Sequence, residues 1–375
     1  MDGFMCGALL AVARKCDRLR EEFERFVREL DGRPDAKAVR ALAARQAMRM
    51  TSEAEEARRH AGALREIAGK TSEETIRTRS RAQSRYRKCA AYGRFAEYFV
   101  IPFLRGYDDE AVMMTKLCRE IAETVAWPSD SCPLVSRGAS NYFHFVAEEG
   151  EELILAPALA GTTVLPLPDL VHEMAHPVVR DSQRRETILG PWHREDFVIE
   201  RVIEKLGDGR FGKAAVRHWI DHGFEEIACD IIAAFVAGPA YGWQHVRACW
   251  GREGDKSVHE DGDHHPPDSG RFAVIQLALA QVAGEEERAE LTEVWNGVVL
   301  GGEEGGEADL EGYYPLELML EFAEEVLRGC VRAGIKPYSD QLPADDPRSR
   351  FNDAWKQMRF EPFEFDASER FISES

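Results

Sequence analysis

Residues 172–176 read His-Glu-Met-Ala-His, so two histidines stand four residues apart with a glutamate beside the first. On an α-helix, four residues turn the chain through about 400°, so both imidazoles project from one side and can bind one metal ion. Glu173 then lies next to that ion, where a carboxylate can take a proton from water. The pattern predicts a Zn²⁺ site with His172 and His176 as ligands and Glu173 as the catalytic base.

A catalytic zinc ion needs a third protein ligand, and the apolar helix predicted from residue 224 to residue 237 offers one. Carboxylates at the start of such a helix are costly to bury unless they meet a cation. Glu226 and Asp230 are four residues apart and share one face. We predict that Glu226 binds the metal and that Asp230 accepts the second N–H of a ligand histidine. Glu225 points about 100° away and is the less favoured ligand.

The motif H-E-x-x-H followed by E-x-x-x-D on a later helix resembles the gluzincin group of zinc metallopeptidases, over about residues 140–245. The resemblance implies His172, His176 and Glu226 as zinc ligands, Glu173 as general base and acid, and Asp230 as the partner of a ligand histidine. It also implies that zinc polarises a scissile carbonyl and lowers the pKa of the attacking water from about 15.7 toward about 7. The sequence departs from the pattern at Pro177, which we expect to end or kink the motif helix.

A zinc peptidase also needs a donor to the oxyanion that develops on the carbonyl oxygen. Tyr241 and His245 follow Glu226 by about 15 and 19 residues, which on a straight helix places them more than about 20 Å away. Only a sharp turn at residues 238–239 could return them to the site. They are candidates for lining a substrate cleft, and a buried aromatic cluster is the equal alternative.

His265 is the preferred oxyanion donor, because it lies on a long loop that two following prolines stiffen. Arg271, at the start of the next helix, is then expected to bind a substrate carboxylate or carbonyl. The loop at residues 254–270 is acidic and rich in histidine, so it could equally be solvated or bind metal adventitiously.

The predicted fold is mainly helical α+β, with a zincin-like core that contains a small antiparallel sheet. Residues 141–146 and 152–155 are the two arms of a predicted hairpin, and residues 162–165 form a third short β-rich run. We divide the chain into a helical, coiled-coil-like region at residues 1–126, a catalytic core at 127–285, and a helical C-terminal subdomain and tail at 286–375.

The N-terminal region is predicted to form long helices that pair as an antiparallel hairpin or coiled-coil arm. A break at residues 31–34 separates the first two, and Thr71 with Glu74 offers a capping box for the third. The arginine-rich stretch at residues 77–88 is interpreted as a solvated face that pairs with acidic residues. The alternative is a docking patch for a protein partner.

Charge and cysteine usage exclude several classes of protein. The chain has 48 Lys and Arg against 67 Asp and Glu, a net charge of −19, which argues against nucleic-acid or anionic-membrane partners. Eight scattered cysteines without a C-x-x-C pair are typical of free thiols in a reducing compartment. Residues 4–13 resemble a signal peptide, but Asp2 stands where a basic residue is expected. We therefore expect a cytoplasmic protein.

The predicted function is zinc-dependent hydrolysis of peptide bonds in a peptide or protein substrate. One alternative is a non-catalytic, zinc-containing binding or regulatory protein that works through its helical arm. Glu173 favours the enzyme, because a purely structural zinc site needs no base. The other alternative is hydrolysis of a non-peptide amide.

Overall fold

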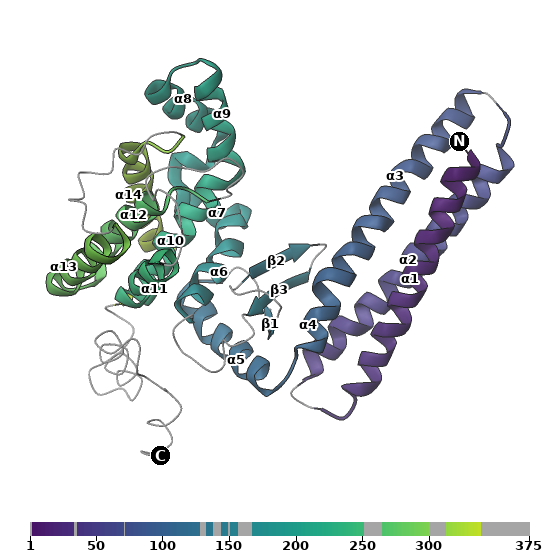
Figure 1. Cartoon of the computed structure of the whole chain (residues 1–375), viewed down its shortest axis with the longest axis horizontal. Coiled ribbons are helices and arrows are strands. Elements are labelled where there is room, and N and C mark those ends of the chain that lie inside the picture. The colour runs from purple at the N-terminus through teal and green to yellow at the C-terminus, as the bar shows by residue number, and fades with distance from the viewer. Residues whose placement is uncertain are drawn as a thin grey trace. The chain divides into compact units, whose positions relative to one another are not determined.

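The computed structural model describes residues 2–33, 36–70, 72–127, 133–137, 144–148, 151–156, 167–250, 265–300 and 313–338 (Figure 1). The predicted β-rich run at residues 162–165 and most of the histidine-rich loop lie outside the described residues. The chain divides into two compact units, residues 1–116 with 133–158 and residues 117–132 with 159–375. The strands therefore belong to the first unit, whereas the sequence analysis grouped their residues with the catalytic core.

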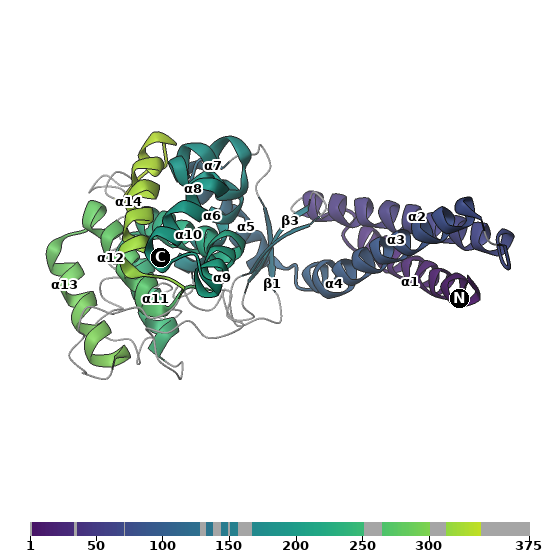
Figure 2. The same ribbon diagram turned by 90° about the horizontal axis from the view of Figure 1, so that it is seen from above.

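Three long helices run side by side in the first unit (Figures 1 and 2). They are α1 (Asp2–Glu29), α2 (Lys37–Glu66) and α3 (Glu73–Phe95), and each packs against the other two. Small and apolar side chains such as Leu9, Ala13, Leu42 and Ala57 fill the space between them. The predicted helical pair is thus joined by a third helix. A π-helical turn (Ala96–Val100), α4 (Ile101–Arg105) and α5 (Asp109–Thr124) follow.

The start of α3 carries a capping box one residue later than predicted. Ser72 Oγ accepts a hydrogen bond from the Thr75 main-chain N–H at 3.2 Å, and Thr75 Oγ1 accepts one from the Ser72 N–H at 2.8 Å. The prediction that used Glu74 is wrong because the helix begins at Glu73, which places Thr75 and not Glu74 three residues after the cap.

Several arginines of the stretch at residues 77–88 pair with acidic side chains of the first unit, as predicted. Arg79 makes two hydrogen bonds to Asp2, at 2.7 and 2.8 Å. Arg85 binds Glu53 at 2.7 Å, and Glu53 is only 6% exposed. This second pair therefore lies inside the helical unit.

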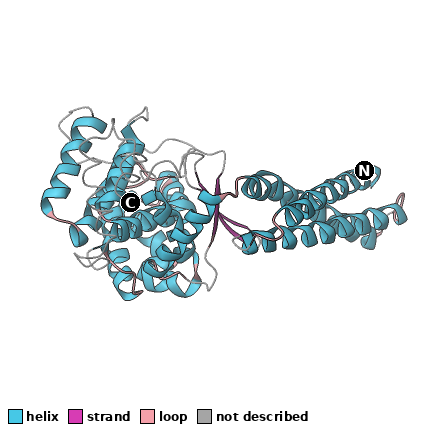
Figure 3. Cartoon of the chain, turned by 90° about the horizontal axis from the view of Figure 1, so that it is seen from below, coloured by secondary structure: helices cyan, strands magenta, loops and turns pink. Residues whose placement is uncertain are grey.

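The sheet, coloured magenta in Figure 3, has three described strands in the order β1-β3-β2. These are β1 (Leu134–Arg137), β2 (His144–Glu148) and β3 (Glu151–Ala156). The strands β2 and β3 are antiparallel, whereas β1 runs parallel to β3. The sheet is therefore mixed, and the expectation of an antiparallel sheet is corrected, because the unpredicted strand β1 joins the other edge of β3. Leu153 and Leu155 of this central strand belong to the apolar core of the first unit.

The second unit is built around α10 (Phe224–Ala237), against which α6 (Leu167–Arg180), α12 (Asp268–Val282) and α14 (Leu316–Arg332) pack. Every residue from Ile227 to Val236 is buried, and all of them except Asp230 are apolar, as is typical of a central helix. The remaining α-helices described in this unit are α7 (Ser182–Leu189), α8 (Glu195–Leu206), α9 (Arg210–His218), α11 (Pro239–Trp250) and α13 (Glu285–Val294).

A sharp turn at Gly238 separates α10 from α11. Gly238 has a φ of 61°, and its N–H closes α10 on the Ala234 oxygen at 3.0 Å. A Cβ at this position would lie 2.6 Å from the ring of Tyr338, so both the dihedral angle and the packing require glycine. The turn brings α11 back against α6.

The motif helix α6 continues past Pro177 to Arg180, so of the two expected effects of this proline, an end or a kink of the helix, the end is wrong. Proline removes one helical N–H, but Val178 and Val179 after it are buried and hold the last turn against the core.

The described chain is mainly helical with one small sheet, which confirms the α+β class. None of its helices, within the described ranges, is both long and apolar enough to cross a bilayer. The cysteines in these ranges are buried and outside any disulfide.

Candidate functional site

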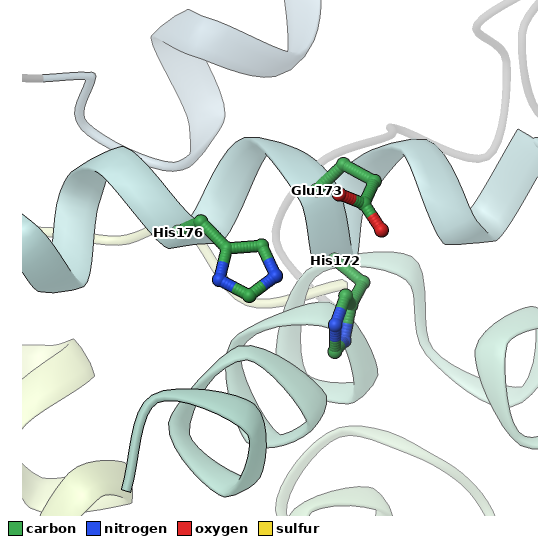
Figure 4. Close-up of side chains that lie close together, drawn as sticks. All are labelled: His172, Glu173 and His176. Carbon is green, nitrogen blue, oxygen red and sulfur yellow. The ribbon is translucent and has the colours of Figure 1, made fainter. Parts of the chain in front are cut away.

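The histidines of the motif project from the same side of α6, and Glu173 lies beside them (Figure 4). His172 and His176 are 6% and 7% exposed, with ring centroids 5.1 Å apart. Nε2 of His172 lies 3.3 Å from Oε2 of Glu226, and Nε2 of His176 lies 3.9 Å from Oε1 of the same carboxylate. The first turn of α10 therefore brings the predicted third ligand to both imidazoles.

These distances fit a zinc ion. With Zn–N and Zn–O bonds of about 2.0 to 2.2 Å, tetrahedral geometry separates ligand atoms by about 3.4 Å. The His172 to Glu226 distance matches this value, and the His176 to Glu226 distance is about half an ångström wider. A carboxylate oxygen of Glu173 lies within 4.8 Å of a nitrogen of each histidine, which places it near such an ion.

The Nδ1 atom of each histidine faces a carboxylate of its own. Nδ1 of His172 lies 3.0 Å from Oδ1 of Asp230, the partner predicted for a ligand histidine. Nδ1 of His176 lies 2.5 Å from Oε1 of Glu225, which Arg180 also binds at 2.6 Å. Carboxylates at Nδ1 fix the ring orientation and leave the Nε2 lone pair for a metal. Glu225 thus contacts the far edge of a ligand and not the Nε2 side.

The carboxylates around His172 favour a positive charge at its position. Burial alone lowers the pKa of His172, but hydrogen bonds to Asp230 and Glu226 outweigh it and raise the pKa to about 10. Burial raises the pKa of Glu226, yet its hydrogen bonds with His172 and His265 bring that pKa well below the usual range. A divalent cation among these groups would supply the charge that their arrangement favours.

Arg271 has a different partner from the one predicted. The residue is 8% exposed, and its Nε and Nη2 donate to Oδ2 and Oδ1 of Asp230, both at 2.7 Å. This buried two-point pair directs the guanidinium at Asp230, the carboxylate that contacts His172. The expected role of Arg271 in binding a substrate stays a prediction.

Tyr241 reaches the site because of the turn at Gly238, but it lies on the far edge of His172. Its hydroxyl donates to Oδ1 of Asp230 at 2.5 Å and lies 2.9 Å from Nδ1 of His172. The hydroxyl therefore contacts both members of the Asp230–His172 pair, on the Nδ1 side of the imidazole. The predicted cleft-lining role of Tyr241 stays a prediction.

His245 belongs to a buried aromatic cluster, the alternative that the sequence left open. It is 5% exposed, and its ring stacks on Trp295 at a centroid distance of 5.6 Å. Its Nε2 donates to the main-chain oxygen of Asp268 at 3.1 Å. The expected role of His245 in binding a substrate stays a prediction.

His265 lies beside the predicted ligand Glu226. Its Nδ1 donates to Oε2 of that carboxylate at 3.0 Å, and its imidazole is 44% exposed. The loop therefore brings it to the site, as predicted, and its role as oxyanion donor stays a prediction.

Three further polar residues were not identified from the sequence. Arg180 follows His176 by one helical turn and binds Glu225. Asp169 precedes His172 by about one turn and accepts a hydrogen bond from Gln244 at 2.6 Å. Burial raises the pKa of Asp169 to about 6. The helical spacing of Arg180 and Asp169 from the histidines was a usable signal, whereas Gln244 is placed only by the return of α11.

Comparison with family models, curated proteins and solved structures finds no match to this chain. The geometry of the second unit is therefore the basis for any assignment.

Proposed function

We propose that the chain is a zinc-dependent hydrolase of peptide bonds with a gluzincin-type ligand set in a zincin-like core. One observation carries the proposal: the Nε2 atoms of His172 and His176 both face the carboxylate of Glu226, 3.3 and 3.9 Å away. Glu173, the residue a hydrolase needs and a structural site does not, has a carboxylate oxygen within 4.8 Å of a nitrogen of each motif histidine.

Each residue then has a distinct role. A zinc ion held by His172, His176 and Glu226 would act as a Lewis acid on the scissile carbonyl and as an activator of water. Glu173 takes the proton of the attacking water and passes it to the leaving amine. Asp230 and Glu225 hold the two imidazoles through their Nδ1 atoms. His265, exposed beside Glu226, is the proposed donor to the oxyanion.

The Glu173→Gln variant tests the proposal. The amide keeps the size of the side chain and leaves the three ligands intact, so zinc content should stay at the wild-type level. Hydrolysis of a broad peptide library should fall by several orders of magnitude, because proton transfer is lost. Glu186→Gln is the matched control, since Glu186 is an exposed glutamate of α7, and it should retain wild-type turnover.

Unchanged turnover in Glu173→Gln would contradict the proposed mechanism. A wild-type protein that binds zinc fully and cleaves no peptide would favour the alternatives. Assay of the same protein on simple amides then separates hydrolysis of a non-peptide amide from a non-catalytic zinc protein.

A further inference from the structure

A second group of possible metal ligands lies in the same unit, apart from the HExxH motif. His245 and Cys249 are four residues apart on α11, and Asp268 is the first residue of α12. One ligand atom from each residue lies within 4.8 Å of the other two. His245 is 5% exposed and Cys249 is 1% exposed, so this group is inside the protein.

The distance between the thiol and the imidazole is that of two zinc ligands. A Zn–S bond of about 2.3 Å and a Zn–N bond of about 2.05 Å at a tetrahedral angle separate the two ligand atoms by about 3.6 Å. Sγ of Cys249 lies 3.6 Å from Nε2 of His245. The four-residue spacing of His245 and Cys249 on α11 therefore holds these two atoms at the separation of two ligands of one zinc ion.

We propose that His245, Cys249 and Asp268 form a second zinc site, with one sulfur, one nitrogen and one oxygen ligand. A thiolate and an imidazole favour zinc over Mg²⁺ and Ca²⁺, which prefer oxygen ligands. On binding, Cys249 releases its proton to solvent. Nε2 of His245 now carries the ring proton and donates it to the Asp268 main-chain oxygen. When Nε2 binds the metal, the imidazole changes tautomer, so that Nδ1 carries the ring proton instead.

The position of this second site gives it a structural role. It connects α11, which carries Tyr241, to α12, which carries Arg271, and both of these residues bind Asp230. Because a metal ion would bind this group only in the folded chain, its binding free energy would add to the stability of the fold. The second zinc ion therefore stabilises the helices that hold Asp230 against His172.

Cobalt substitution tests the second site without any measurement of activity. The first site offers only nitrogen and oxygen ligands, so a near-ultraviolet charge-transfer band from thiolate to Co²⁺ reports the second site alone. Titration of the metal-free, full-length protein with Co²⁺ should give two equivalents bound, and one of them should produce this band.

Variants assign each equivalent to its site. Cys249→Ser should remove the charge-transfer band and weaken one equivalent by at least tenfold, while the visible bands of the other Co²⁺ remain. His176→Ala should weaken the other equivalent and remove its visible bands, while the charge-transfer band remains. Cys330→Ser is the matched control, because Cys330 is another buried thiol, on α14, and it should leave both equivalents unchanged.

The proposal is overturned if the folded wild-type protein binds one equivalent without a charge-transfer band, or if the band persists in Cys249→Ser. Should that variant fail to fold, alkylation of the His176→Ala protein, which lacks a complete first site, supplies the readout, with peptide mapping to follow Cys249. Co²⁺ should slow alkylation of Cys249 at least tenfold, and an unchanged rate would overturn the proposal. Failure of the peptidase assay would leave all of these outcomes unaffected.

Discussion

Two adjacent glutamates take different positions around the motif histidines. Glu226 faces the Nε2 atoms, whereas Glu225 contacts Nδ1 of His176. We therefore expect Glu226→Ala, like His172→Ala and His176→Ala, to remove one equivalent of zinc. Glu225→Gln should weaken zinc affinity only about 10- to 100-fold, as the loss of a partner of a ligand usually does. Elemental analysis combined with chelator competition measures both effects. Full zinc loss in Glu225→Gln with retention in Glu226→Ala would exchange the two roles.

The raised pKa of Asp169 predicts a pH dependence of stability in the zinc-free protein. The folded-state pKa is about 6, above the unfolded value of about 3.9, so the folded state binds more protons between these two pH values. The protonated Asp169 side chain therefore contributes to the stability of the folded state below pH 4. This contribution to the free energy of unfolding, about 3 kcal/mol at most, is lost as the pH rises through 6.

Asp169→Asn removes this titration and should flatten the dependence of the free energy of unfolding on pH over that range. Urea unfolding at several pH values in the presence of a chelator measures it. Asp196→Asn, at an exposed aspartate of α8, is the control and should keep the wild-type slope. An equal slope in Asp169→Asn and the wild type would show that Asp169 is ionised throughout.

At the residue scale, the sequence predicts those contacts that helix geometry alone determines. The spacing of His172 and His176, and that of Glu226 and Asp230, follows from the helical turn. The contacts of Tyr241 and Arg271 with Asp230 depend on the turn at Gly238 and on how α12 packs on α10. Local spacing encodes neither the turn nor the packing of α12. The sequence alone therefore predicts that these two side chains bind a substrate, and it does not predict their contacts with Asp230.

At the scale of elements, a close approach between two helices depends on one glycine. A Cβ at Gly329 of α14 would lie 2.0 Å from the main-chain oxygen of Ile188 in α7, where no flexible side chain can move aside. Gly329→Ala should lower the free energy of unfolding by about 1 to 3 kcal/mol, the usual cost of overpacking. Gly297→Ala is the control, because a Cβ there meets nothing within 4 Å and should cause no comparable loss. Denaturant unfolding of both variants measures the difference, and equal stability would contradict the predicted clash.

The predicted elements were most accurate where a strong pattern ends at a strong signal. The helix predicted over residues 224–237 has those bounds because an apolar run ends at a glycine with positive φ. The strand β1 was missed because it has only four residues among prolines, serines and glycines. The motif helix passes through Pro177, and the two valines after it are buried, so tertiary packing competes there with the local preference of proline.

At the scale of the whole molecule, the two compact units have separate cores. The core of the first unit contains residues of α1 to α5 and of β3, and that of the second surrounds α10. The candidate zinc ligands all belong to the second unit. A ligand that binds only the folded form of one unit stabilises that unit and leaves the other unchanged.

Calorimetry of the full chain should therefore show two unfolding transitions, of which zinc moves only one. At a free zinc concentration of about 100 times Kd, each zinc site should contribute about 2.7 kcal/mol to this shift, or about 5 to 10 °C for a unit of this size. Arg85→Ala breaks the inward-facing ion pair with Glu53 in the first unit. The free energy of unfolding of that unit should fall by about 3 to 5 kcal/mol, and its transition should move to a lower temperature. His176→Ala should remove the part of the zinc-dependent shift that the first site contributes and leave the transition affected by Arg85→Ala in place. A single transition that responds to both zinc and Arg85→Ala would show that the two units unfold as one, because the stabilisation of one core would then be transmitted to the other.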